Sequence, residues 1–243
     1  MRSGHIVAAL WIVNIATSPF SSFGQGVRAI DAPIDGPAAL AIDNRGHLFV
    51  ASLYENNVRR IDLREGTIVT VAGNGKECCY ADQLKATDVS LKSIWSLAVN
   101  SKGDIFISEG EEVRKVDGRT GLISTFAGNG VSGTTTEGFT ATSTAFGEIW
   151  SLAIDSHYNL FMADIGQEKI FRIEASTGRV FRVAGDGKHG FAGDGGKGRD
   201  ASFHSIKSIA FDKRDNLYIA DHENCRIRLM DHETGVIQTL AGC

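Results

Sequence analysis

The stretch 216-NLYIADHENCRIRLMDHETGVIQTLAG-242 contains three short apolar runs separated by polar turn residues, and a fourth run precedes it at 208–211. This pattern predicts a four-stranded antiparallel meander with strands at 208–211, 217–220, 227–230 and 236–240. Asp212 opens the first turn, where its side chain can cap the backbone. Gly235 stands where a tight hairpin needs a positive φ. A single meander cannot bury both of its faces, so further sheets must stack on it.

The same pattern occurs four times along the 243 residues of the chain. Leu-Ala-Ile-Asp-like segments begin at residues 40, 97, 152 and 209, which are 57, 55 and 57 residues apart. Ala-Gly pairs at 72–73, 127–128, 184–185 and 241–242 recur at spacings of 55, 57 and 57. Two landmarks that keep phase define four tandem repeats, at about 34–75, 91–130, 146–187 and 203–242. Because stacked meanders arranged radially form a propeller, we predict an all-β propeller of four four-stranded antiparallel blades.

The composition of individual strands predicts where they lie in each blade. The first run of every repeat is small and apolar throughout, as expected for a strand crowded on both sides near the propeller axis. The third run alternates apolar and basic residues, as in 113–116 and in Ile227-Arg228-Leu229. This alternation predicts one buried apolar face and one wet basic face.

Residues 216–228, Asp231, the pair 234–235 and the pair 241–242 resemble the pattern "NLYIAD..N.RIR..D..TG.I.T.AG" of NHL-repeat propellers. The resemblance extends over 34–242. The connector 185–196 is similar to the loop "AG.G..GFSGDGG" of bacterial exported NHL proteins and of teneurin-like propellers. The resemblance implies a six-bladed-propeller-like fold. NHL propellers usually carry five or more blades. This chain has four repeats and so departs from that number.

The repeat count leaves closure of the ring open between two arrangements. The first strand begins near Ala38 and the last ends at 240–242, so no strand is left to complete a blade from the opposite terminus. Four blades either close as an unusual ring or form an open or truncated arc. We expect the arc, with the apolar faces of the first and fourth blades exposed or buried by self-association.

Residues 1–24 have the layout of a signal peptide. Arg2 precedes an apolar run at 6–16 and a small, polar stretch at 17–26, with Ser22 and Gly24 placed for cleavage before Gln25. The apolar run is too short for a hydrocarbon core, which needs about 20 residues. We therefore expect export to an extracytoplasmic location, secreted or periplasmic, without a membrane anchor.

Charge and cysteine content narrow the range of partners. The formal net charge is −4, and removal of residues 1–24 would bring it to −5. Nucleic acid is therefore not expected as a partner, because its binding needs a basic surface. The four cysteines permit two disulfides in an exported protein, with connectivity undecided among Cys78, Cys79, Cys225 and Cys243. A bridge from Cys243 to the 78–79 pair would require a closed ring.

One residue after each second strand is a candidate site residue, and the four repeats have Ser52, Glu109, Asp164 and Asp221 there. Three converging carboxylates could hold a divalent cation such as Ca²⁺. Resemblance to gluconolactonase-like propellers implies that this ion would act as a Lewis acid in lactone opening. The favoured alternative is that the acid caps the turn into the third strand, because it follows the repeat symmetry. His222, beside Asp221, is the histidine that could act as a base, against the alternative of a solvated loop residue.

Trp95 and Trp150 occupy one repeat position, just before the innermost strand, with Lys207 as their counterpart in the fourth repeat. Two aromatic side chains at the mouth of a propeller could bind a protein or a sugar, or they could pack between blades. No motif predicts a catalytic residue or a resident cofactor. We expect a non-enzymatic, exported scaffold that binds a protein or carbohydrate partner. The rival is a metal-dependent, lactonase-like hydrolase using Glu109, Asp164 and Asp221.

Overall fold

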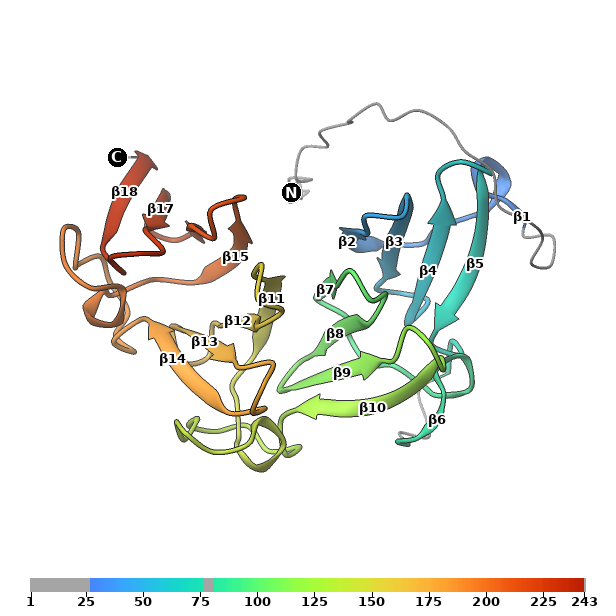
Figure 1. The fold of residues 1–243 in the computed structure, drawn as a ribbon, viewed down its shortest axis with the longest axis horizontal. Coiled ribbons are helices and arrows are strands. Elements are labelled where there is room, and N and C mark those ends of the chain that lie inside the picture. Colours follow the sequence, from blue (N-terminus) through green and yellow to red (C-terminus); the bar gives the residue numbers. More distant parts are fainter. Residues whose placement is uncertain (1–26, 77–80, 243) are drawn as a thin grey trace, which may run out of the picture.

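The computed structural model describes residues 27–76 and 81–242. These residues form four antiparallel sheets that stand side by side as the blades of a propeller (Figure 1). The prediction of an all-β propeller with four blades, each built on a four-stranded meander, is confirmed. The six-bladed fold implied by the family resemblance is wrong for this part of the chain, because each of the four repeats makes one blade and the described residues contain no others.

Every blade runs from an innermost strand to an outer strand in chain order. The innermost strands are β2 (Pro37–Ile42), β7 (Ser96–Val99), β11 (Ile149–Ile154) and β15 (Ile206–Phe211). The second strands are β3 (His47–Ser52), β8 (Ile105–Glu109), β12 (Leu160–Asp164) and β16 (Leu217–Asp221). The third strands are β4 (Asn57–Asp62), β9 (Glu112–Val116), β13 (Lys169–Ile173) and β17 (Arg226–Met230). The fourth strands are β5 (Thr67–Ala72), β10 (Leu122–Ala127), β14 (Val180–Ala184) and β18 (Ile237–Gly242).

The connectors between blades also repeat, which the sequence pattern did not reveal. Blades 1 and 2 gain a fifth, outermost strand, β1 (Val27–Arg28) and β6 (Leu84–Lys85), respectively. A 3-10 helix stands in the connector of every repeat: η1 (Ala29–Asp31), η2 (Ala86–Asp88), η3 (Ala141–Ser143) and η4 (Gly198–Asp200). These three-residue turns are the only helices in the described part of the chain. Elements this short have no periodicity that a sequence could display.

The alternation of repeat spacing has a local cause in blade 2. The hairpin between β8 and β9 consists of Gly110 and Glu111 alone, whereas the equivalent hairpins span 53–56, 165–168 and 222–225. The Leu-Ala-Ile-Asp-like marker of blade 2 lies before this hairpin, and its Ala-Gly marker lies after it. The two missing residues therefore shorten the second interval of the first series and the first interval of the Ala-Gly series. One deletion therefore accounts for the exchange of 57 and 55 between the two series.

The backbone geometry of the Ala-Gly marker explains why glycine follows alanine in each repeat. Gly185 has a φ of 90°, and a Cβ at this position would collide with the carbonyl oxygen of Glu168. Its N–H donates to the carbonyl of Gly198 at 2.9 Å, which ties the end of blade 3 to the connector that enters blade 4. Glycine is required both for the positive φ and for this close approach of two backbones.

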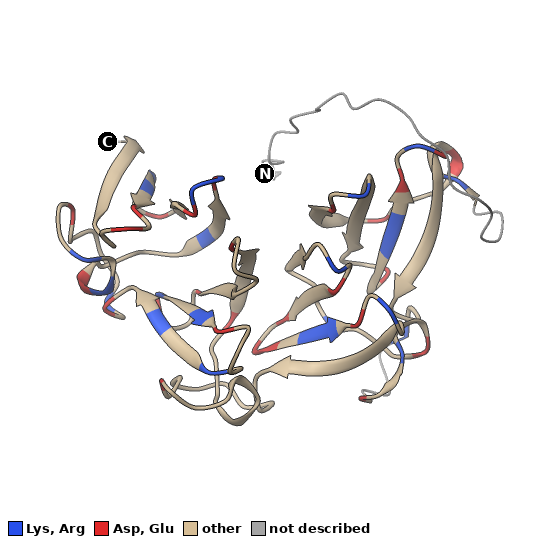
Figure 2. Ribbon diagram, viewed as in Figure 1, with Lys and Arg blue, Asp and Glu red and all other residues tan. Residues whose placement is uncertain are grey.

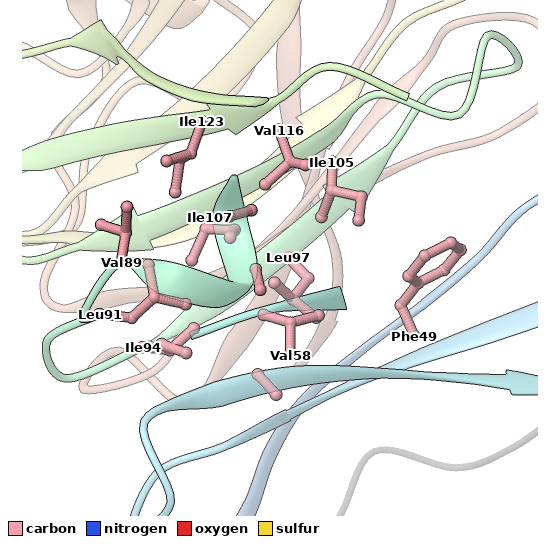
Figure 3. Packing of buried hydrophobic residues seen from close by; sticks show 13 residues of the cluster. Phe49, Val58, Val89, Leu91, Ile94, Leu97, Ile105, Ile107, Val116 and Ile123 are labelled. Carbon is pink, nitrogen blue, oxygen red and sulfur yellow. The ribbon is translucent and has the colours of Figure 1, made fainter. Parts of the chain in front are cut away.

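Apolar side chains between consecutive blades form three separate cores. Figure 3 shows the cluster between blades 1 and 2, where Phe49 and Val58 of blade 1 face residues such as Leu97 and Ile107 of blade 2. Equivalent clusters lie between blades 2 and 3 and between blades 3 and 4. Each blade therefore completes its burial with its neighbours, as in other stacked-repeat proteins.

The predicted buried apolar face of the third strands is present in blades 1 to 3, where Val58, Val113 and Ile170 are fully buried, but the predicted wet basic face is wrong at Arg114 and Arg228. Arg228 is fully buried, whereas Ile227 beside it is 39% exposed. The guanidinium of Arg228 donates to the carbonyls of Ser202 and Ala192 in the connector, which covers that face of the blade. The connector, which the pattern did not include, therefore buries the basic side chain, and Ile227 is exposed because no described blade packs on its face of the sheet.

The four blades form an open arc in the described residues, in agreement with the expected open form. Contacts between innermost strands join β2 to β7, β7 to β11 and β11 to β15. No strand of blade 1 pairs with a strand of blade 4 within 27–76 and 81–242, and Figure 1 shows the two end blades apart. The described residues contain no helix that could span a membrane. The proposed signal peptide and Cys78, Cys79 and Cys243 lie outside the described residues, so export and disulfide pairing stay predictions.

Candidate functional site

A β-bulge at the start of β11 positions Trp150. In β11, Ile149 pairs with Asp164 and Ser151 with Ala163, which leaves Trp150 as the extra residue. The same shift makes Lys207 the extra residue in β15 and Ala38 the extra residue in β2. A bulge changes the direction of a side chain relative to the regular pleat. The bulge therefore brings the side chains of Ala38, Trp150 and Lys207 to the same end of the propeller axis. Trp95 has the equivalent repeat position in blade 2, directly before the start of β7.

These side chains form a stack across three blades. The rings of Trp95 and Trp150 lie 4.7 Å apart with an angle of 8° between their planes. The ammonium group of Lys207 lies 3.3 Å from the centre of a Trp150 ring, in cation–π geometry. All three side chains are partly exposed. We call Trp95, Trp150 and Lys207 the rim stack.

The rim stack is open at its first end, beside blade 1. One face of Trp95 stacks on Trp150, and the position in the preceding blade is the small, exposed Ala38. No aromatic or cationic partner contacts the second face of Trp95 among the described residues. Exposed Glu148 accepts a hydrogen bond from Nε1 of Trp150 at 3.2 Å and fixes the ring. The shortest hairpin at this rim, 110–111, belongs to the same blade as Trp95.

The repeated carboxylates are engaged separately, each within its own blade. Glu109, Asp164 and Asp221 accept backbone N–H bonds from Lys92, Gly147 and His204, respectively, at 2.7–2.9 Å. Each donor stands seventeen residues before its acceptor, in the connector that enters the blade. Asp164 also accepts from Gln167 and Asp221 from Asn224, which cap the hairpin into the third strand. Ser52 occupies the equivalent position in blade 1 and is buried.

Burial dominates the electrostatics of two of these groups. Desolvation raises the pKa of Glu109 to about 7 and that of Asp164 to about 6, despite the hydrogen bonds that oppose it. Raised values occur in catalytic sites, but structural burial produces them too. Among the described residues no three His, Cys, Asp or Glu side chains are grouped so that they could share a metal ion. The arrangement therefore offers the carboxylates no common ion in this part of the chain.

His222 and Asp221 are not brought together as a base and its orienting acid. The His222 ring is exposed, and its Nδ1 lies 3.2 Å from a carboxylate oxygen of Glu223. The carboxylate of Asp221 is buried and accepts from His204 and Asn224 instead. Of the six residues considered from the sequence, the structure brings together only Trp95 and Trp150. Lys207, which joins them, was identifiable from the repeat spacing that aligned the three positions.

The raised pKa of Glu109 predicts an unusual dependence of stability on pH. A carboxyl whose native pKa is about 7 and whose unfolded value is 4.5 binds more protons in the native state between these values. The free energy of unfolding should therefore fall by up to about 3 kcal/mol as the pH rises through this window, and then level off. Glu109→Gln should remove this part of the slope in urea unfolding measured at several pH values.

The matched control for this experiment is Glu233→Gln, which changes an exposed carboxylate in the last hairpin of blade 4, away from Glu109. That variant should keep the wild-type slope between pH 4.5 and 7, because Glu109 is intact. A Glu109→Gln protein with an unchanged slope would contradict the assignment. Asp164, with its own pKa raised to about 6, leaves a smaller slope of the same sign in every variant.

Comparison with known proteins identifies relatives at low identity. No family model matches the chain. The chloroplastic protein SUPPRESSOR OF QUENCHING 1 of Arabidopsis thaliana is 26% identical over 243 residues, which cover 95% of this chain and 23% of that protein. Human Teneurin-1 is 27% identical over 240 residues, covering 86% of this chain and 8% of the relative. This chain thus spans less than a quarter of either curated relative.

Solved structures with the same fold are also longer than this chain. A Bacteroides thetaiotaomicron protein of unknown function matches with a TM-score of 0.63 at 17% identity, over 79% of this chain and 46% of its own. An auxiliary nutrient binding protein from Bacteroides ovatus matches with a TM-score of 0.61 at 18% identity, over 86% and 49%. At these identities the matches show the fold alone. The propeller fold and the teneurin relatives together support a propeller of the NHL type.

Proposed function

We propose that this chain is an exported, non-enzymatic propeller scaffold that binds a partner at the rim stack. The observation that carries the proposal is the stacked pair of Trp95 and Trp150, which is partly exposed and lies at the repeat position where blades 1, 3 and 4 have a bulge, Trp150 itself being the bulged residue of β11. A side chain needed only for packing between blades would not have to be exposed at the rim. The remaining repeat residues act in turns and blade contacts, and fold alone does not specify an activity.

A carbohydrate is the partner class that the rim stack favours over a protein. The second face of Trp95 can stack on the apolar face of a sugar ring. The exposed carboxylate of Glu148, at the edge of the Trp150 ring, supplies a hydrogen-bond acceptor at the same rim. Two of the solved structures of similar fold are named auxiliary nutrient binding proteins, from Bacteroides thetaiotaomicron and Bacteroides ovatus. Another neighbour is named as an extracellular domain, in keeping with the extracytoplasmic location we propose.

The lactonase-like alternative receives no comparable support. Its three carboxylates are buried in separate blades and each is committed to backbone N–H groups of its own connector. A general acid or a metal ligand must reach substrate or ion, and no such shared position exists among the described residues. We therefore propose binding without turnover.

The test is binding of soluble hexasaccharides of different linkage, followed by intrinsic tryptophan fluorescence and calorimetry. We expect at least one of them to bind, and Trp95→Ala to weaken it at least about tenfold through loss of ring stacking. Tyr158→Ala is the matched control, because Tyr158 is an exposed aromatic on a loop at the opposite end of the innermost strands. Equal loss in both variants, or binding unaffected by Trp95→Ala, would contradict the site. Binding to proteins alone would transfer the proposal to a protein partner.

A further inference from the structure

The three contacts between blades share one plan. Each apolar cluster is accompanied by a backbone hydrogen bond from the glycine of an Ala-Gly marker to the first carbonyl of the next 3-10 helix. The bonds run from Gly73 to Ala86, from Gly128 to Ala141 and from Gly185 to Gly198, at 2.8–2.9 Å. The N–H of this glycine therefore pairs each blade with a carbonyl acceptor in the connector of the next blade.

Two of the three contacts also contain a serine bridge near the propeller axis. The Oγ of Ser96 accepts the N–H of Leu152 at 3.0 Å, and the Oγ of Ser151 accepts the N–H of Ile209 at 3.0 Å. Ala39 replaces the serine in blade 1, so the contact between blades 1 and 2 lacks the bridge. The serine is therefore a feature of particular blade faces and has a partner wherever it faces another blade in the described chain.

The face of blade 4 that points away from blade 3 has every part of this plan, and no blade of the described residues packs on it. Ser208 is the repeat equivalent of Ser151, and it is exposed with no hydrogen-bond partner among the described residues. Ile227 is 39% exposed, whereas its equivalent Ile170 in blade 3 is fully buried. Leu240 is 52% exposed, and its equivalent Val183 packs against the core between blades 3 and 4.

The face of blade 1 that points away from blade 2 has the complementary parts. Leu40 is 46% exposed, whereas its equivalents in the other three blades are each 5% exposed at a blade contact: Leu97, Leu152 and Ile209. Ile42 on the same strand is 63% exposed. Ala29 begins η1, as Ala86 begins η2, so its carbonyl stands where the other connectors accept a glycine N–H. Each end of the arc thus matches one half of the contact that the chain makes internally three times.

We propose that blade 4 of one molecule packs on blade 1 of a second copy of this chain, head to tail. Ile227 and Leu240 would be buried against Leu40 and Ile42 in the manner of the internal clusters. The Oγ of Ser208 would accept the N–H of Leu40, and the N–H of Gly242 would donate to the carbonyl of Ala29. This surface is distinct from the rim stack and does not depend on the ligand bound there.

Head-to-tail packing uses two different surfaces, and this makes the contact heterologous. A substitution on one face leaves the other face of the same molecule competent. Two variants with opposite defects can therefore form one good contact between them and cannot extend it. A contact between two like faces, such as blade 4 with blade 4, would not show this behaviour.

Sedimentation velocity of the chain over a range of concentrations tests the proposal. We expect species of two or more copies that grow with concentration, and their loss to a monomer in Ile227→Glu and in Leu40→Glu. Leu240→Glu and Ile42→Glu are second choices for the same faces, since both residues are more exposed and their substitution disturbs folding less. Val131→Glu is the matched control, an apolar residue 60% exposed on a connector, and should associate like the wild type.

An equimolar mixture of Ile227→Glu and Leu40→Glu should recover a species of two copies that does not grow further. Circular dichroism of each variant establishes that it is folded before mixing. A wild-type chain that stays monomeric at all concentrations would overturn the proposal. Association that survives all four end-face substitutions, or a mixture of the two defective variants that stays monomeric, would overturn it as well.

Discussion

Replacing Arg228 by alanine is expected to destabilise the protein by about 3–5 kcal/mol, as found when one partner of a buried ion pair is removed. The guanidinium is fully buried, 3.6 Å from the carboxylate of Asp221 and 2.8 Å from that of Asp194. Asp221 is itself fully buried. Without Arg228 its charge would stay in the interior with only hydrogen bonds from His204 and Asn224 to compensate it.

Arg228 also holds the connector onto the sheet, which adds to its effect. It donates to the carbonyls of Ala192 and Ser202, and its guanidinium lies 5.3 Å from the ring of Phe203. Alanine would leave these carbonyls without their donor and open a space beneath the connector. The unfolding midpoint in guanidinium chloride measures the loss.

Blade 3 suggests which replacement the site tolerates best. Phe171 occupies the position of Arg228 there and packs at 5.8 Å, edge to face, with Phe146, the equivalent of Phe203. Arg228→Phe should therefore lose less stability than Arg228→Ala, because it refills the space with a side chain that another blade already accommodates. Arg226→Ala, two residues away and partly exposed, is the control and should cost at most about 1 kcal/mol. Equal losses in Arg226→Ala and Arg228→Ala would refute this account of the buried pair.

The strands and turns were predictable because each is specified locally and repeated. The Asx loops show this, since Asp212 accepts the backbone N–H groups of Arg214 and Asn216, and Asp43 does the same for Arg45 and His47. The hairpin glycine of the repeat has the positive φ predicted for it, as at Gly235. Four occurrences of each signal outweigh the ambiguity of any single one.

The environment of a residue was not predictable where it depends on the neighbouring blade. Ile170 and Ile227 are the same residue at the same repeat position, yet one is buried and the other exposed, because only the first has a blade packed on it. For the same reason, the pattern could not distinguish carboxylates that converge from carboxylates that bind separate connectors. The rim stack was partly predictable, because the shared phase of Trp95 and Trp150 placed them together.

The contact between blades 2 and 3 depends on a fully buried aromatic side chain, that of Phe146. Phe146 is fully buried in the cluster between these blades, and Phe146→Ala should cost about 3–5 kcal/mol through lost burial and the cavity left behind. Phe139→Ala, in the same connector but 59% exposed, should change the free energy of unfolding by only about 0.5 kcal/mol. Denaturant unfolding followed by far-ultraviolet circular dichroism compares the two variants.

The tryptophan pair locates where that loss acts, because Trp95 belongs to blade 2 and Trp150 to blade 3. Repeat proteins are stabilised by nearest-neighbour contacts, so weakening one contact can separate the units on either side of it first. In Phe146→Ala the exciton signal of the stacked rings should disappear at lower denaturant than the strand signal. Phe203→Ala removes the equivalent side chain between blades 3 and 4 and should leave the ring signal to persist at least as long as the strands of blade 3. Identical behaviour of the two variants would mean that the four blades unfold as one unit, and that the three cores are not independent contacts.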